Sequence, residues 1–170
     1  MMTQSDSFII RERLPYLALS GAVLVVDRLT KFLIDQRFEV GEPLTLIAGF
    51  FNLTYVRNTG VAFGVFASAD SPYRVVVLSG FAVAAAVVVA IYSVRSPIGQ
   101  SVLQTGLALI FGGAIGNLYD RLIYGYVIDF LEFHLDAYYW PNFNVADTAI
   151  SVGVALLGVE IIRDEIRSRS

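Results

Sequence analysis

The sequence predicts an integral membrane protein that is mainly α-helical, and two observations carry this prediction. The first is composition: 56% of the 170 residues are hydrophobic, 16% are charged and the mean hydropathy is +0.65, which is too apolar for an ordinary soluble domain. The second is the presence of two long uncharged stretches, at 75–94 and 96–119. Because about 20 apolar residues cross a bilayer core, each stretch can form a membrane-spanning helix. We place these spans at about 74–94 and 98–119.

Two further spans are expected nearer the ends of the chain, at about 14–34 and 143–162. Both are long enough to cross a bilayer, although charged residues interrupt each of them. The interruptions are Asp27, Arg28 and Lys31 in the first, and Asp147 and Glu160 in the second. The expected architecture is therefore a single polytopic membrane domain, residues 1–170, with four transmembrane helices.

Arginine residues indicate how these spans are oriented. In a four-span bundle, both terminal tails and the short loop between the second and third spans lie on one side of the membrane. These segments carry Arg11, Arg13, Arg95, Arg163, Arg167 and Arg169. By the positive-inside rule that side is cytoplasmic, so both termini are expected in the cytoplasm and the two longer connections outside. The count alone does not decide the orientation, because the other six Lys and Arg residues would then lie toward the outside.

The two outer connections differ in composition. Residues 40–66 are rich in β-branched and aromatic residues and include the turn sequence RNTG at 57–60, which predicts a small extracytoplasmic β-rich layer between helices 1 and 2. Residues 131–142 hold an aromatic cluster. Because aromatic side chains favour the boundary between water and lipid, we expect an interfacial segment between helices 3 and 4.

Polar residues in three of the spans converge on the same leaflet. Residues three or four apart share a helix face, so each of these spans presents one polar stripe. A charge facing lipid is costly, about 2.5–3.5 kcal/mol at the bilayer centre, so the stripes are expected to face one another in a polar pocket near the outer surface. The stripes are Asp27 with Lys31, Asn117 with Asp120 and Arg121, and Asn144 with Asp147.

Two carboxylates near this pocket are candidates for chemistry, Asp129 and Asp147. Two carboxyl groups brought together cannot both ionise easily, so one keeps a proton. In an aspartic protease the ionised carboxylate takes a proton from water, and the protonated one polarises the scissile carbonyl. Asp147 could instead cap a helix or pair with Arg121. Spacing alone also allows Asp120, rather than Asp129, as the partner of Asp147.

Several other polar residues have simple structural interpretations. Asp120 and Arg121 are expected to form an ion pair that fastens a helix end. Asp27 and Lys31 are expected to form an intrahelical pair that lowers the cost of burying two charges. Asn58 is expected to be a turn residue, because Asn favours turns.

The remaining features narrow the choice of chemistry. Gly112 and Gly116 form a small-xxx-small pattern that lets helices pack closely. His134, the only histidine, is expected to be an interfacial residue. The absence of cysteine excludes a thiolate metal site, and the spacing of the carboxylates does not suggest a site made of carboxylates alone. Ser151 lies one turn beyond Asp147 but has no Lys or His base at a suitable spacing. The net charge of −3 gives no basic face for nucleic acid.

Five short motifs, read in order, resemble those of the lipoprotein signal peptidases, the type II signal peptidases of bacteria. They are DRLTK at 27–31, RNTGVAF at 57–63, GNLYDR at 116–121, VIDF at 127–130 and FNVAD at 143–147. The resemblance covers nearly the whole chain. Two departures are small: the family often has D-Q-x-x-K where this chain has DRLTK, and Val is common where this chain has Ile128.

This resemblance implies an aspartic endopeptidase of the bacterial cytoplasmic (inner) membrane, with its active site near the extracytoplasmic surface. Such an enzyme removes the signal peptide from prolipoproteins by cutting on the N-terminal side of a cysteine that carries diacylglycerol. The expected partners are these prolipoproteins and membrane lipid, with no nucleic acid. No cofactor or metal is expected, and the chain is expected to act as a monomer.

The resemblance also assigns roles to individual residues. Its catalytic pair falls on Asp129 and Asp147. The positions that bind substrate or support the pair are Asn58, Gly60, Asn117, Arg121 and Asn144, and those with a structural polar role are Asp27, Lys31 and Asp120.

Two other classes of function fit parts of the same pattern. A small proton-coupled transporter also places carboxylates in a membrane, although the long uncharged stretches of the second and third spans give no proton path across. A non-catalytic assembly factor held together by glycine-mediated packing would leave Asp129 and Asp147 dispensable.

Overall fold

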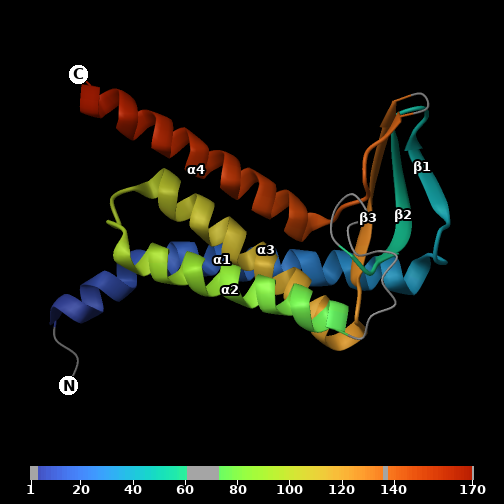
Figure 1. The fold of residues 1–170 in the computed structure, drawn as a ribbon, viewed down its shortest axis with the longest axis horizontal. Helices are drawn as coiled ribbons and strands as arrows, with labels where there is room; N and C mark the ends of the chain where they lie inside the picture. The colour runs from blue at the N-terminus through green and yellow to red at the C-terminus, as the bar shows by residue number, and fades with distance from the viewer. Residues whose placement is uncertain (1–3, 61–72, 136–137, 170) are drawn as a thin grey trace.

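The computed structural model describes residues 4–60, 73–135 and 138–169. Its helices are α1 (Gln4–Arg37), α2 (Tyr73–Arg95), α3 (Ser101–Tyr124) and α4 (Val145–Arg169), and its strands are β1 (Pro43–Ile47), β2 (Phe51–Asn58), β3 (Val127–Leu135) and β4 (Tyr138–Tyr139). Figure 1 shows the sheet at one end of the helices, while α1 begins and α4 ends at the other end. The expected fold, mainly α with a small β-rich layer, is confirmed.

Helices α1 and α2 extend beyond the expected spans at both ends, whereas α3 and α4 begin two or three residues later than expected and end beyond them. Within the described residues, α2, α3 and α4 are long and apolar enough to cross a membrane; α1, which contains the first expected span, is not among them, because charged residues interrupt its apolar run. Helix α1 has 34 residues, or about 51 Å of length at 1.5 Å per residue, against a bilayer core of about 30 Å. Its charged residues Asp27, Arg28 and Lys31 lie in the half nearer the sheet. The extra turns contain Arg11, Glu12 and Arg13 at the start and Gln36 and Arg37 at the end, and these residue types are good helix formers in water.

Helix α3 is the centre of the bundle. It packs against α1, α2 and α4. In its most apolar stretch 61% of the residues are buried, compared with 17% in α2 and 22% in α4. Because α2 and α4 are mostly exposed and strongly apolar, their outer faces are suited to lipid.

Glycines on α3 allow this close packing, as the small-xxx-small pattern predicted. A side chain at Gly112 would collide with the backbone of Ser20 on α1, and one at Gly116 would collide with the Asp27 carboxylate. On another face of α3, a side chain at Gly113 would collide with the carbonyl oxygen of Ala146. These three glycines therefore bring α1 and the start of α4 directly onto α3.

The sheet contains more of the chain than the sequence indicated. Its order is β1-β2-β3-β4, with antiparallel neighbours. The hairpin β1–β2 forms the expected layer between helices 1 and 2, while residues 61–66 of the expected range lie outside the described residues. The segment between helices 3 and 4, expected to be interfacial, contributes β3, which pairs with β2 along its length.

A small apolar core joins this sheet to the helices. Ile34 of α1 packs with Tyr55 of β2 and with Ile128 and Phe130 of β3. Helix α3 ends at Gly125, whose φ of 77° lies in the left-handed region that favours glycine, and the chain turns there into β3. The core and this turn fix β3 against the ends of α1 and α3.

Candidate active site

Asp129 lies in the first half of β3, on the part of the sheet that meets the helices. In the β2–β3 ladder it is opposite Val56, which makes Asn58 its diagonal neighbour. Asn58 Nδ2 donates a hydrogen bond of 2.8 Å to Asp129 Oδ2, while its Oδ1 accepts one of 3.0 Å from the Gly60 backbone N–H. Asn58 therefore has both the turn contact and a direct contact with Asp129.

The start of α4 is tied to the same strand by backbone hydrogen bonds. Leu131 and Phe143 exchange two of these, of 2.8 and 3.1 Å. Asn144 follows as the N-cap of α4, and its Oδ1 accepts a 2.9 Å bond from the Asp147 N–H. In return, Asp147 Oδ2 accepts a 3.2 Å bond from the Asn144 N–H. This reciprocal capping box satisfies two N–H groups at the helix end and fixes the Asp147 carboxylate beside β3.

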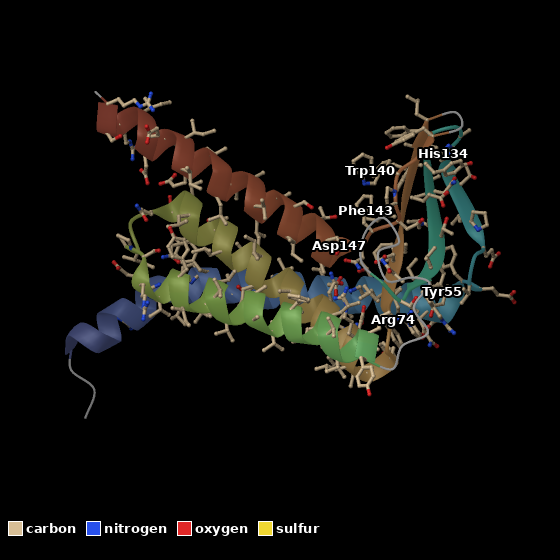
Figure 2. All side chains as sticks on the ribbon, in the orientation of Figure 1. Tyr55, Arg74, His134, Trp140, Phe143 and Asp147 are labelled. Carbon is tan, nitrogen blue, oxygen red and sulfur yellow. The ribbon has the colours of Figure 1, made fainter. Side chains whose placement is uncertain are left out.

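Asn144 connects the two aspartates. Its side chain is fully buried, and its Nδ2 donates to Asp129 Oδ1 at 2.7 Å and to the Ile128 carbonyl at 3.2 Å. Because the same residue caps α4 through Asp147, one asparagine sets the position of both carboxylates. The capping role considered for Asp147 is therefore present and is also what brings it to Asp129. Figure 2 shows Asp147 at the end of α4 that faces β3.

Asn117 of α3 holds Asp147 from the other side. Its Nδ2 donates a 2.7 Å hydrogen bond to Asp147 Oδ1. Its Oδ1 accepts from Lys31 Nζ at 3.0 Å and from Asn144 Nδ2 at 3.1 Å. Asn117 therefore lies between the acid pair and a buried cation.

That cation belongs to a cluster of four charges on α1 and α3. Lys31 Nζ lies 2.9 Å from Asp27 Oδ2 and 2.8 Å from Asp120 Oδ2, and all three side chains are fully buried. Arg28 also pairs with Asp120, and its guanidinium lies 4.3 Å from the centre of the Tyr119 ring. Two cations and two carboxylates make the cluster neutral, which lowers the cost of burying it.

The cluster confirms one expected pair and corrects another. Asp27 and Lys31 form the intrahelical pair that their spacing predicted. The pair expected between Asp120 and Arg121 is wrong, because the ion-pair partners of Asp120 among the described residues are Lys31 and Arg28. Neighbouring residues on a helix point in different directions, so Asp120 faces α1 while Arg121 lines a cavity.

This cavity contains both aspartates. It has a volume of about 720 Å³, enough for several residues of a substrate. At its polar end lie Asp129, Asp147, Asn58, Asn117 and Arg121, and its apolar walls are formed by Ala82, Ala85, Ile110, Ala114, Ile150, Val152, Trp140 and Phe143. Ser151 lies on the wall, without a Lys or His partner among the described residues that line it.

The two aspartates are in different electrostatic surroundings. Burial and, to a smaller extent, the negative charge of Asp147 raise the pKa of Asp129 to about 7, while the hydrogen bonds from Asn58 and Asn144 and the charge of Lys31 oppose the rise. Asp129 is therefore mostly protonated below about pH 7. Asp147 is less buried than Asp129 and lies in the first turn of α4. The positive end of the helix favours the ionised form there.

His134 lies away from these acids. It is on β3 towards the tip of the sheet, and its ring stacks on Tyr139 with centres 5.0 Å apart (Figure 2). It lines a separate apolar hollow with Phe50, Phe133, Leu135, Tyr138, Trp140 and Phe143.

Two features of the site were missed from the sequence. One is Arg28 as a partner of Asp120, since no spacing rule connects residues on different helices. The other is the placement of Asp129 on a strand. The run VIDFLEFHL at 127–135, rich in β-branched and aromatic residues, is the signal that could have indicated it.

Two carboxylates in one cavity, at the end of a bundle of apolar helices, are the arrangement that a membrane enzyme of the aspartic peptidase type requires. The signal peptidase (SPase) II family matches residues 19–163. A lipoprotein signal peptidase of Syntrophus aciditrophicus is 41% identical over 150 residues, which cover 88% of this chain and 93% of the relative. One of Geobacter sulfurreducens is 46% identical over 144 residues, which cover 85% and 89%.

A solved bacterial membrane enzyme superposes with a TM-score of 0.79 at 25% identity, covering 88% of this chain and 94% of its own. The chain belongs to the signal peptidase II family. This membership selects the peptidase among the three classes of function that the sequence allowed.

Proposed function

We propose that this chain is a membrane-embedded aspartic endopeptidase that removes the signal peptide from prolipoproteins, with Asp129 and Asp147 as its catalytic pair. The reaction is supported by membership of the signal peptidase II family. The observation that supports the residues is the convergence of two carboxylates in one large cavity, one from a strand and one from a helix N-terminus.

The surroundings of the pair divide the chemical work between its members. Asp147, at the positive end of α4 and bonded by Asn117, is the ionised carboxylate and serves as the general base. Asp129, with its raised pKa, carries the proton and serves as the general acid. Asn144, which bonds to both, maintains the distance between them.

The reaction balances with water as the only co-reactant. Asp147 removes a proton from water while the water oxygen attacks the scissile carbonyl carbon, and Asp129 gives its proton to the carbonyl oxygen. Asp147 then transfers its proton to the leaving amine nitrogen as the C–N bond breaks. Asp129 recovers a proton from the hydroxyl of the intermediate, so the pair ends with the one proton with which it began.

The shape of the cavity supports a lipidated substrate. Its polar end can hold the peptide bond, and its apolar walls, formed by α2, α3 and α4, can accept the acyl chains of a diacylglyceryl cysteine. Cleavage on the N-terminal side of that cysteine would keep the lipid against the apolar wall and the bond at the acids. We assign contacts with the peptide backbone to Asn58, Gly60 and Arg121, of which Asn58 and Arg121 line the cavity.

We place the enzyme in the bacterial cytoplasmic membrane, as a monomer with both termini in the cytoplasm and the acids near the outer surface. The distribution of arginines supports this orientation. So does the arrangement of the bundle, in which α1 begins and α4 ends at the end away from the sheet (Figure 1).

The test is cleavage of a purified diacylglyceryl-modified prolipoprotein in lipid. Asp129→Asn and Asp147→Asn should each reduce kcat by about 10²–10⁴-fold, because each removes one acid–base group. Glu132→Gln is the matched control: it makes the same carboxyl-to-amide change on β3, where Glu132 bonds Asn52 outside the cavity. Full activity in either asparagine variant would refute the pair, and no cleavage by the wild type would refute the function.

A further inference from the structure

Lys31 has one hydrogen bond that its structural role does not explain. An ammonium group has three N–H donors, and Lys31 has three partners within 3.0 Å: Asp27, Asp120 and the Oδ1 of Asn117. The two carboxylates neutralise its charge. The third partner is the residue that bonds Asp147, so Lys31 is connected to the acid pair through one amide.

The contact with Lys31 fixes which way the Asn117 amide points. Lys31 can only donate hydrogen bonds, so it must face the carbonyl oxygen of Asn117, and the amide N–H of Asn117 then faces Asp147. Asn144 adds to this by donating to the same oxygen. The reversed amide would place its oxygen against Asp147, and that contact is favourable only when Asp147 is protonated.

Asp129 has no equivalent connection among the described residues. It accepts hydrogen bonds from Asn58 and Asn144, at 2.8 and 2.7 Å. The Asn144 amide divides its two N–H groups among three acceptors, namely Asp129, Asn117 and the Ile128 carbonyl. A donor bonded to a cation is polarised and binds a carboxylate more strongly than a shared neutral one.

We propose that Lys31 is a positioning residue which, through Asn117, makes Asp147 the ionised base of the pair and leaves the proton to Asp129. This inference rests on the proposed function and concerns how the pair is prepared for it. Lys31 is fully buried and does not line the cavity, so it acts without touching substrate.

Other charges also face this region and must be separated from Lys31. They are Asp27 and Arg28 on α1, Asp120 and Arg121 on α3, and Asp129 on β3. Because Arg28 and Lys31 together balance Asp27 and Asp120, a single substitution in the cluster would change its net charge. Paired substitutions that remove one cation and one carboxylate keep it neutral.

The test variant is the double substitution Asp27→Asn with Lys31→Met. It removes one opposite pair and keeps the Arg28–Asp120 pair, and Asn at 27 can still accept the Ala146 N–H, a bond of 3.0 Å in the wild type. We expect the acidic limb of the pH profile of kcat/KM to move up by about one pH unit, since an ionised Asp147 has lost its polarised donor. At a pH below the new limb, kcat falls about tenfold, while KM is unchanged.

The matched control is Arg28→Gln with Asp120→Asn. It also removes one buried opposite pair, but it leaves the contact between Lys31 and Asn117 in place. Its acidic limb should stay at the wild-type position. Equal shifts in the two double variants, or no shift in the test variant, would overturn the proposal, because the effect would then be general to the cluster or absent.

A double-mutant cycle tests whether the connection runs through Asn117. Asn117→Leu, of similar shape, should shift the acidic limb in the same direction, and adding Asp27→Asn and Lys31→Met to Asn117→Leu should produce no further shift. Additive shifts would overturn the proposal. If the test variant does not insert in the membrane, Asp27→Asn with Lys31→Gln takes its place, because Gln at 31 can still hydrogen-bond Asp120 and Asn117 but carries no charge. The wild type is assayed beside every variant. No cleavage by the wild type would refute the proposed function, whereas cleavage by the wild type with an unshifted test variant would refute only the role of Lys31.

Discussion

Two groups of buried carboxylates lie near the sheet end of the bundle, and their charges are balanced in opposite ways. Asp27 and Asp120 contact cations directly, through Lys31 and Arg28. Asp129 and Asp147 accept hydrogen bonds from the neutral amides of asparagines, and Arg121 acts on them only at longer range. A paired carboxylate stays ionised and holds helices together, whereas a carboxylate without a contacting cation can take up and release a proton.

Substitutions in the two groups should therefore differ in what they damage: a change at the acid pair removes activity, and a change in the charge cluster removes stability. The largest expected effect is the loss of activity. Asp129→Asn should lower kcat by about 10²–10⁴-fold. It should leave the thermal unfolding temperature unchanged or higher, because it replaces a desolvated acid by a neutral amide of the same shape. Unfolding by fluorescence and cleavage are measured on the same sample. An inactive variant that also unfolds well below the wild type would assign Asp129 to the structure instead.

The next effect is on stability. Asp120→Ala should lower the free energy of unfolding by about 3 kcal/mol, because it leaves Lys31 and Arg28 without a carboxylate between them. Yield in detergent and the unfolding temperature measure this loss. Unfolding at the wild-type temperature, with normal yield, would show that the four-charge cluster is not what holds α1 to α3.

The pH dependence separates the two groups further. Because Asp129 must hold a proton and its pKa is raised to about 7, kcat/KM should fall as the pH rises through about 7. The same carboxyl binds its proton more tightly folded than unfolded, where its pKa is 3.8. The contribution of Asp129 to the free energy of unfolding should therefore be most favourable below about pH 4 and should decrease as the pH rises to about 7.

The matched measurement for this pH dependence uses Asp129→Asn. That variant should lose the decrease in stability between about pH 4 and pH 7, because the titrating group is gone. A stability profile identical to that of the wild type would mean that Asp129 has an ordinary pKa, and the comparison between the two groups would fail.

The smallest effect is expected at the exposed edge of the cluster. Arg28→Gln should cost about 1 kcal/mol, since the Arg28 side chain is 22% exposed and Lys31 still neutralises Asp120. The loss includes the contact between its guanidinium and the Tyr119 ring. Chemical denaturation of Arg28→Gln and Asp120→Ala under the same conditions measures the two losses in free energy of unfolding. A loss in Arg28→Gln as large as that in Asp120→Ala would make Arg28, and not Lys31, the main partner of Asp120.

The parts of this site that could be predicted are those that follow from local spacing. Asp27 and Lys31 are four residues apart on a helix, so their pairing was visible in the sequence. The closeness of Asn144 and Asp147 was visible for the same reason. The hairpin β1–β2 was indicated by its composition and turn residues.

The parts that could not be predicted depend on how distant elements meet. Arg28 reaches Asp120 only because Gly112 and Gly116 let α1 lie directly on α3, and no local rule gives that alignment. The choice of Asp129 over Asp120 as the neighbour of Asp147 depends likewise on β3 pairing with β2 and with Phe143. Spacing left both acids open, and the turn at Gly125 separates them onto different elements.

An infrared pH titration of the protonated carboxyl band, in wild type minus Asp129→Asn, shows directly whether Asp129 holds the one proton that the pair shares. A difference band should be present at pH 6 and disappear around pH 7 to 8, in line with a pKa of about 7. A difference band that is already absent at pH 6 would show that Asp129 does not hold the proton, contrary to the role proposed for it.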